Sequence, residues 1–296
     1  MDDKYLAILE YFKIIDQLAE RTSFSAGTEL ALSLRPSADE AQVRRSIQET
    51  TEAKALLSIH PGLAPRGAHD VRPLVRRATL EGVLRAHELL AVSSTLASAR
   101  TLRQVLARRA DDCPLLATKG NRLQLLPVVL GEIERCLDEE GRMLDSASAA
   151  LAHLRRDGRI ARERVRRRLR GIITSSEKAH FLQEPIITER NGRYVIPLRV
   201  EFKGRIPGII HDQSASGATL FIEPLETIEL NNQWHQLRLE EQREVERILG
   251  ELSRLVASEA DALNCDVELL AELDLALAKG RYSSALRGVP ATLCGD

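Results

Sequence analysis

Aromatic residues are scarce in this sequence and unevenly placed. Phe, Trp and Tyr make up 3% of the 296 residues, and none lies between Ser25 and His180, whereas five occur between Phe181 and Trp234. The first part of the chain must therefore bury mainly aliphatic side chains. The return of aromatic residues indicates a change of architecture near residue 180.

Cysteine pairs and long apolar runs are also lacking. The four cysteines, Cys113, Cys136, Cys265 and Cys294, lie far apart without a CxxC pair, which excludes a disulfide framework and a zinc knuckle. No run of about 18 apolar residues occurs, and the first residues, 1–4, are charged where a signal peptide needs an apolar segment. We therefore expect a cytoplasmic protein with no membrane partner.

Motifs that bind phosphate or metal are absent too. No two of the 17 glycines are separated by a single residue and none precedes Lys, so neither GxGxxG nor GxxxxGK[ST] occurs. His87-Glu88 continues as Leu-Leu-Ala, which excludes an HExxH zinc site, and the other histidines lack ligand spacing. We expect no metal site, no cofactor and no catalytic residue in this chain.

One group of potentially catalytic side chains lies close together. His211, Asp212 and Ser214 are the residue types of a hydrolase triad, but neighbours in sequence seldom form one, and residues 214–217 are not a GxSxG elbow. We interpret this segment as a polar turn between two strands, with a self-contained hydrolase as the remaining alternative.

Apolar periodicity predicts helices in the first part of the chain. Apolar residues recur three and four positions apart in residues 6–18, 43–57 and 89–106, with Gly, Pro and Ser between these segments. Such helices bury one stripe each in a bundle.

Two longer helices are expected further on. One begins at Asp145, Ser146 or Ser148, and the other runs from Leu225 to Lys279 with a break only at Gly250. Between them, turn residues separate β-prone runs, and Asn191-Gly192 is a hairpin signal. The insert joins two helix ends that must lie side by side, so the helices should run antiparallel and carry it at their tip. The β-prone runs are residues 194–200, 206–211 and 218–222.

Charge is balanced overall but segregated along the chain. The net charge of −1 excludes binding of nucleic acid by bulk charge alone. Residues 145–180 carry ten basic and four acidic side chains, and nine of the ten are arginines from Arg155 to Arg170. Residues 225–279 carry five basic and thirteen acidic ones. In an antiparallel pair, the arginines would face Glu240, Glu241, Glu244 and Glu246.

Two uses of these arginines remain open. They can pair with the acidic helix, as complementary charges do along a coiled coil, or some can stay free for phosphate. The insert adds further basic side chains. The candidate nucleic-acid-binding residues are Arg159, Arg162, Arg166, Arg167, Arg170, Arg190, Arg193, Lys203 and Arg205.

Several segments closely resemble the second bacterial subfamily of MutS proteins. The longest are NGRYVIP at residues 191–197, GRIPGIIHDQSASGATLFIEP at 204–224 and ELNN at 229–232; shorter ones are LEY at 9–11, LRPS at 34–37 and LDSAS at 144–148. The resemblance implies a mainly α fold with a small β-rich insert, built as a helical core bundle, a long antiparallel two-helix lever and a clamp. The implied domains are a core at 1–140, an ascending lever helix at 141–180, a β-rich clamp at 181–224 and a descending lever helix at 225–296.

The same resemblance implies a function. Members of the subfamily bind branched DNA to restrain homologous recombination and act on collided ribosomes, so duplex or branched DNA and the ribosome or its rRNA are the expected partners. The chain would be the N-terminal part of a homodimeric ATPase and endonuclease, associated with nucleoid or ribosome, whose ATP and Mg²⁺ bind in another domain. No catalytic residue transfers to this chain. The alternative is a non-catalytic coiled-coil module that displays a β-head to a protein or ribosomal partner.

Overall fold

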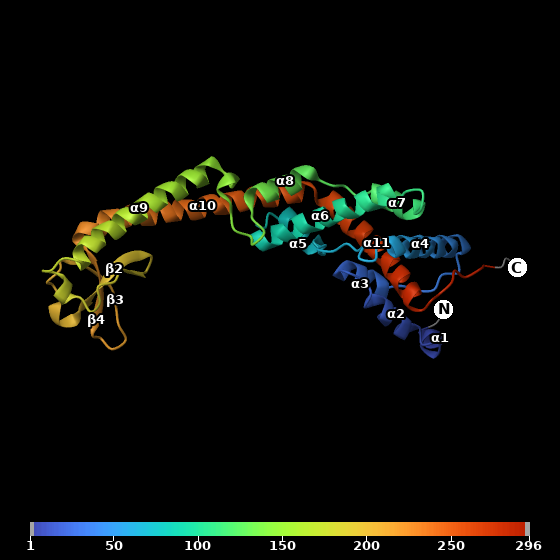
Figure 1. Ribbon diagram of the computed structural model, residues 1–296, viewed down its shortest axis with the longest axis horizontal. Helices are drawn as coiled ribbons and strands as arrows, with labels where there is room; N and C mark the ends of the chain where they lie inside the picture. The colour runs from blue at the N-terminus through green and yellow to red at the C-terminus, as the bar shows by residue number, and fades with distance from the viewer. Residues whose placement is uncertain (1–2, 294–296) are drawn as a thin grey trace. The chain divides into compact units, whose positions relative to one another are not determined.

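The computed structural model describes residues 3–293, and over that range the fold is mainly α-helical with one small sheet, as the sequence predicts (Figure 1). The helices are α1 (Asp3–Ile8), α2 (Tyr11–Ala19), α3 (Ser25–Leu32), α4 (Glu40–Ile59), α5 (Arg72–Thr79), α6 (Ala86–Arg108), α7 (Pro114–Asn121), α8 (Pro127–Cys136), α9 (Ala149–Ile173), α10 (Ile228–Ser258) and α11 (Ala260–Ala285). The strands are β1 (Thr188–Arg190), β2 (Arg193–Arg199), β3 (Gly208–Gln213) and β4 (Thr219–Pro224).

The chain divides into two compact units, which we describe separately. Residues 1–142 and 249–296 form the first unit, and residues 143–248 form the second. The second unit contains α9, most of α10 and the sheet. No helix in the described range is long and apolar enough to cross a membrane.

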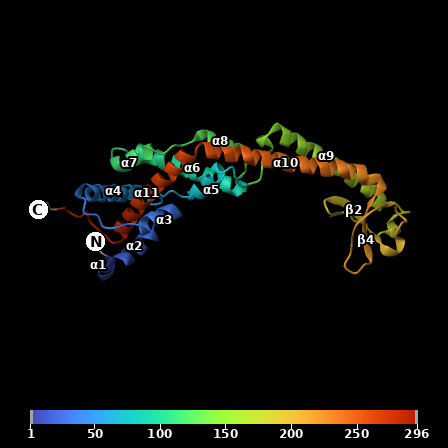
Figure 2. The same cartoon turned by 180° about the vertical axis from the view of Figure 1, so that it is seen from behind.

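Helix α11 organises the first unit. It packs against α3, α4 and α5, among others, and is buried along most of its length (Figure 2). Close approach of α11 to α4 requires a glycine, because a Cβ at Gly280 would lie 2.9 Å from the backbone nitrogen of Lys54 and 3.1 Å from the Cβ of Ala53. Backbone contact at this point fixes which side chains of the two helices face each other nearby.

The second unit contains an antiparallel sheet of strand order β1-β2-β4-β3. Asn191 and Gly192 connect β1 to β2 with φ angles of 51° and 72°, which confirms the predicted hairpin. Strands β2, β3 and β4 match the three predicted runs within two residues at each end. The register between β3 and β4 shifts at His211, between Ile210 and Asp212.

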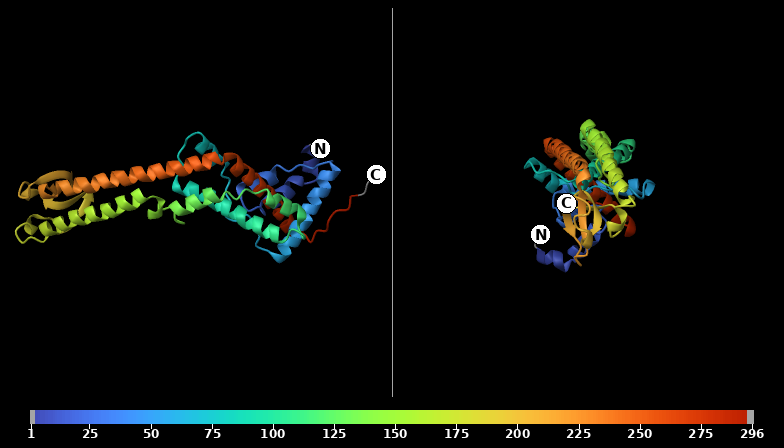
Figure 3. Two further views of the ribbon diagram at one scale, coloured as in Figure 1. Left: turned by 90° about the horizontal axis from the view of Figure 1, so that it is seen from above. Right: turned by 90° about the vertical axis from the view of Figure 1, so that its left-hand side faces the viewer.

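Helices α9 and α10 enclose the core of the second unit together with the sheet. Tyr194 and Trp234 stack with ring centroids 4.5 Å apart. Arg155 binds Glu241, and Arg168, later on α9, binds Glu226, which comes earlier in the returning segment. The two helices therefore run antiparallel (Figure 3). The buried core consists of Ala161, Val165, Leu169, Ile172, Leu182, Tyr194, Ile196, Leu198, Ile206, Leu220, Ile222 and Trp234.

Two predicted helices are interrupted where the sequence shows no breaker. The segment 6–18 divides into α1 and α2 at Glu10, whose φ of 54° is left-handed. The expected helix from Leu225 begins at Ile228, passes through Gly250 without a break and is interrupted at Glu259. Glu259, between α10 and α11, has a φ of −107° and a ψ of 23°, outside the helical range. The prediction of a break at Gly250 was wrong, because one glycine costs a helix only about 1 kcal/mol.

Candidate nucleic-acid interface

Helix α9 presents arginines on both sides of its apolar stripe. The hydroxyl of Ser148 caps the helix by accepting a hydrogen bond from the backbone N–H of Leu151 at 2.9 Å. Ala161, Val165 and Leu169 face the core, so the arginines fall on two flanks. Gly158 and Gly171 lie within the helix, and nothing approaches within 4 Å of where their Cβ atoms would be.

A hollow of about 520 Å³ follows one flank, at positions 164, 167, 168 and 171, which share a helix face. We call it the Lys178 hollow. Arg168 and Lys178 share the carboxylate of Glu226, with Lys178 at 3.3 Å. Arg164 and Arg167 have no ion-pair or hydrogen-bond partner among residues 3–293. The hollow is lined by Arg164, Arg167, Arg168, Gly171, Ile172, Ser175, Lys178, Glu226 and Leu230.

A second hollow, of about 460 Å³, follows the opposite flank at positions 155, 158, 159 and 162. We call it the Trp234 hollow. Glu241 neutralises Arg155 at 2.8 Å, and Glu189 neutralises Arg238 at 2.9 Å. Arg162 donates to the Tyr194 hydroxyl at 2.9 Å. The hollow is lined by Arg155, Gly158, Arg159, Arg162, Glu189, Tyr194, Trp234, Arg238 and Glu241.

The other arginines predicted on this helix differ in their surroundings. Arg159 is exposed and has no partner in the described part of the chain. Arg166 is half-buried, and its Nε atom is buried without a hydrogen-bond partner. Arg170 pairs with Glu163 of the same helix at 3.2 Å. An exposed pair of this kind contributes little and can exchange for phosphate.

The acidic residues of α10 mostly find partners on α10 itself. Glu244 pairs with Arg247 at 2.7 Å, and hydrogen bonds from Arg247 and then Ser148 lower the pKa of Glu244 to about 2. Glu240 and Glu246 accept hydrogen bonds from glutamines four residues earlier. Of the four glutamates expected to face the arginines, only Glu241 binds one in the described structure. Pairing between the arginines and the acidic segment 225–279 is therefore limited, in the described structure, to Arg155 with Glu241 and Arg168 with Glu226, and the interpretation of a continuous charge zipper is wrong.

Arg155 makes other contacts besides its ion pair with Glu241. Its guanidinium also binds the carboxylate of Asp145 at 2.7 Å and donates to the carbonyl of Met143 at 2.8 Å. Burial works against the charged form, but the hydrogen bonds that Arg155 donates to Asp145 and Glu241 outweigh it and raise the pKa of Arg155. Arg155 thus joins the helix start to α10 rather than facing solvent.

In the sheet, Arg193 is bound to neighbouring protein side chains. Its guanidinium binds the carboxylate of Glu223, which is fully buried, at 2.9 Å, and donates to Asn232 at 2.7 Å. His211 Nε2 lies 2.6 Å from the same carboxylate. Arg193 was predicted to bind nucleic acid. In the structure its guanidinium is held by Glu223 and Asn232, because the buried carboxylate of Glu223 needs a counter-charge.

Arg190 is partly engaged as well. It pairs with Asp212 at 3.1 Å and lies over the Phe221 ring at 4.2 Å. Lys203 and Arg205, on the segment between β2 and β3, are exposed and make no side-chain contact with a partner in the described residues. They are the predicted basic residues of the insert that are free for an anion.

The residues considered as a triad do not form one. His211 binds Glu223, Asp212 binds Arg190, and the hydroxyl of Ser214 accepts from the N–H of Thr219 at 3.0 Å. Ser214 instead begins the turn between β3 and β4, as predicted. Among residues 3–293, no group of three or more His, Cys, Asp or Glu residues could hold a metal ion.

The candidate list drawn from the sequence left out three basic residues of the Lys178 hollow: Arg164, Arg168 and Lys178. Arg164, Arg167 and Arg168 share a face by their spacing of three and four, which is a signal available from sequence. The approach of Lys178 depends on the loop after α9 and could not be read from periodicity.

Comparison with known proteins identifies the family. Three relatives are each named Endonuclease MutS2. That of Symbiobacterium thermophilum is 44% identical over 96% of this chain and 35% of its own length. That of Geobacillus sp. is 43% identical over 97% of this chain and 37% of its length, and that of Clostridioides difficile is 36% identical over the whole chain and 38% of its length. No protein-family model matches the chain. The chain thus spans little more than a third of these relatives, and by this likeness over its full extent it belongs to the MutS2 subfamily of MutS proteins.

Proposed function

We propose that this chain is a nucleic-acid-binding module of a MutS2-type endonuclease and that it binds duplex or branched DNA without sequence preference. The observation that carries the proposal is the Lys178 hollow, where four cationic side chains meet a single carboxylate, that of Glu226. The relatives named Endonuclease MutS2 support DNA as the partner.

The chemistry of the hollow suits phosphate. Arginine presents a planar set of donors that matches phosphate oxygens, and Arg164 and Arg167 have no carboxylate to satisfy them. Glu226 neutralises only part of the positive charge of the hollow, and an anion between Arg164, Arg167 and Lys178 would neutralise more of it. Such contacts position a backbone and carry no sequence information, so binding depends on shape rather than base order.

The proposed contacts narrow the predicted set. Arg159, Arg167, Lys203 and Arg205 remain in it, and Arg164 is added. Arg162 and Arg170 are secondary contacts because they already bind Tyr194 and Glu163, and Arg166 is secondary because it is half-buried. Arg193 is left out because the buried carboxylate of Glu223 binds it, and Arg190 is left out because it pairs with Asp212 and also packs over the Phe221 ring.

The broader role follows the relatives. We propose that the whole bacterial protein acts in the cytoplasm as a homodimer that binds branched DNA and restrains homologous recombination. ATP and Mg²⁺ would bind in the length of the relatives that this chain does not span, since its residues include no phosphate loop. An action on collided ribosomes is the second possibility for the whole protein.

Fluorescence anisotropy with labelled DNA tests the proposal. The 296-residue chain should bind a duplex and a four-way junction with a Kd on the order of micromolar near physiological salt. If about three or four phosphates are contacted, log K should fall against log salt with a slope of roughly −3 to −4.

Charge-reversal variants locate the contact. Arg164→Glu with Arg167→Glu should weaken binding at least about tenfold, and Lys203→Glu with Arg205→Glu should weaken it if the insert also contacts DNA. Arg100→Glu with Arg122→Glu is the matched control, because both arginines belong to the first unit, are exposed and have no ion-pair partner among the described residues. Equal losses in the α9 and control variants would reject a specific face. No binding of DNA at low salt, with binding to purified ribosomes, would favour the interaction module.

A further inference from the structure

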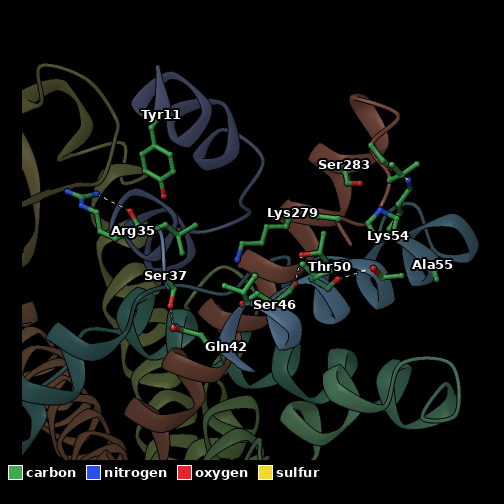
Figure 4. Close-up of a pocket in the computed structure, with 18 of the residues that line it drawn as sticks. Tyr11, Arg35, Ser37, Gln42, Ser46, Thr50, Lys54, Ala55, Lys279 and Ser283 are labelled. Atoms are coloured by element: carbon green, nitrogen blue, oxygen red, sulfur yellow. Dashed lines mark hydrogen bonds between the residues drawn. The ribbon is translucent and has the colours of Figure 1, made fainter. Parts of the chain in front are cut away.

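A cavity of about 770 Å³ lies in the first unit, apart from the residues discussed above. Its walls come from four places: α2, the loop after α3, one side of α4, and the last turns of α11 with the segment after it (Figure 4). Cavities of roughly 300–1,000 Å³ are typical of small-molecule sites. This cavity therefore has the volume for a ligand the size of a mononucleotide.

The charge of the cavity has one sign. Arg35, Lys54 and Lys279 line it, and no Asp or Glu is among its lining residues. Lys54 donates one hydrogen bond to the carbonyl of Gly288 at 2.7 Å, and no carboxylate of the described residues forms an ion pair with it. Three cations around one space without a carboxylate select for an anion.

Lys279 provides the strongest evidence that the cavity binds an anion. Contact of the neighbouring Gly280 with α4 positions it at the wall, and Figure 4 shows its side chain extending from α11 into the cavity. Its ammonium has no ion pair or hydrogen bond with any described residue. Glu49, the carboxylate whose charge acts on Lys279, is already bound by Lys119 at 3.0 Å and Arg45 at 3.2 Å.

Burial, more than the neighbouring charges, lowers the pKa of Lys279; Glu49 opposes this shift and Lys119 adds to it. An ammonium group held in a partly dry wall without a counter-ion is unfavourable. A bound anion would supply the missing charge.

The remaining walls suit an organic body. The hydroxyls of Tyr11, Ser46 and Ser283 have no hydrogen-bond partner within residues 3–293, so they can bind polar atoms of a ligand. The cavity is also lined by the apolar side chains of Val43, Ile47 and Val289, and Val289 is 87% exposed. A flat apolar ring would cover that surface.

We propose that this cavity binds a nucleoside monophosphate without a metal ion, with the phosphate at Lys279 and Arg35 and the base against the apolar wall. Phosphate charge matches the three cations, and the volume exceeds what inorganic phosphate needs. Metal-free binding follows because no Asp or Glu is among the described residues that line the cavity, so none is there to hold Mg²⁺. The inference stands independently of DNA binding, which uses residues of the other unit.

Isothermal titration of the 296-residue chain in EDTA tests it with AMP and GMP as probes. A Kd on the order of 10–100 μM is expected for a ligand of this size. Adenosine and inorganic phosphate separate the two parts of the ligand, and each should bind at least about tenfold more weakly than AMP.

Lys279→Met and Arg35→Gln should each raise the Kd for AMP at least about tenfold. Arg35 is exposed, so its replacement does not disturb the core. Arg100→Met is the control. Lys279→Met should melt no lower than the parent without ligand, because it removes an unpaired charge from the wall. The inference is overturned if phosphate binds as tightly as AMP, if binding requires Mg²⁺, or if both variants bind AMP like the parent.

Discussion

The carboxamide of Asn231, at the start of α10, makes both of its hydrogen bonds to the backbone of Tyr194 in β2. It accepts from the N–H of Tyr194 at 3.1 Å and donates to its carbonyl at 3.0 Å. The ladder between β2 and β4 begins at Ile196, so Tyr194 lies beyond it and Asn231 takes the place of a strand. This fully buried side chain joins the helix to the sheet.

Replacing that amide should therefore destabilise the second unit. Asn231→Ala leaves a buried N–H and a buried carbonyl without partners, at about 1–3 kcal/mol each, so we expect a loss of at least about 2 kcal/mol in urea unfolding. Gln233→Ala, an exposed neighbour, should change the free energy of unfolding by less than about 0.5 kcal/mol. Similar stability of the two variants would show that water replaces the amide.

Arg193 should affect stability before it affects DNA binding. Arg193→Ala leaves the buried carboxylate of Glu223 with only His211, and we expect a loss of about 2–4 kcal/mol. The double variant Arg193→Met with Glu223→Gln should lose less than the sum of the single changes, which a double-mutant cycle measures. Arg205→Ala, which breaks no contact, should melt like the parent.

The two adjacent glutamates of α10 should respond differently to charge reversal. Glu241→Lys places a cation against Arg155 and should cost about 1 kcal/mol at low salt, with the loss shrinking in high salt. Glu240→Lys only removes a hydrogen bond from Gln236 and should cost a few tenths of a kcal/mol. Equal losses in thermal unfolding at low salt would mean that Glu240 also faces the arginines in solution.

Asp266 should make the first unit less stable as the pH rises. Burial raises the pKa of Asp266 to about 6, against the hydrogen bond that it accepts from the N–H of Gln124 at 2.7 Å. The folded state therefore holds a proton that the unfolded state, with a pKa of about 4, has released. The carboxyl opposes folding progressively between pH 4 and about 6 and fully above that.

Asp266→Asn keeps the acceptor and removes the charge. Relative to the parent, its free energy of unfolding should rise by about 1–2 kcal/mol between pH 4.5 and 7.5, after allowance for solvent screening. Urea titrations at the two pH values measure this difference. A difference that stays constant with pH would mean that Asp266 is already ionised at the lower value.

Local chemistry was sufficient for much of the second unit. Asn191 and Gly192 accept left-handed backbone angles more readily than other residues, so the hairpin could be predicted from two letters of sequence. The cap at Ser148 depends on the next three residues alone. The breaks at Glu10 and Glu259 could not be predicted, because neither involves Gly or Pro and a left-handed Glu10 persists only where surrounding contacts hold it.

The sequence by itself determined the faces of α9, since a period of 3.6 residues separates the apolar stripe from the arginines on both flanks. Only the tertiary structure decided which arginines are neutralised. Glu223 approaches Arg193 from another strand and Lys178 reaches Glu226 from a loop, so each pairing joins segments far apart in the chain. The same holds for the cavity at Lys279, whose walls come from four segments. Charge pairing acts over a few ångströms in space, and periodicity within one helix carries no information about what folds against it.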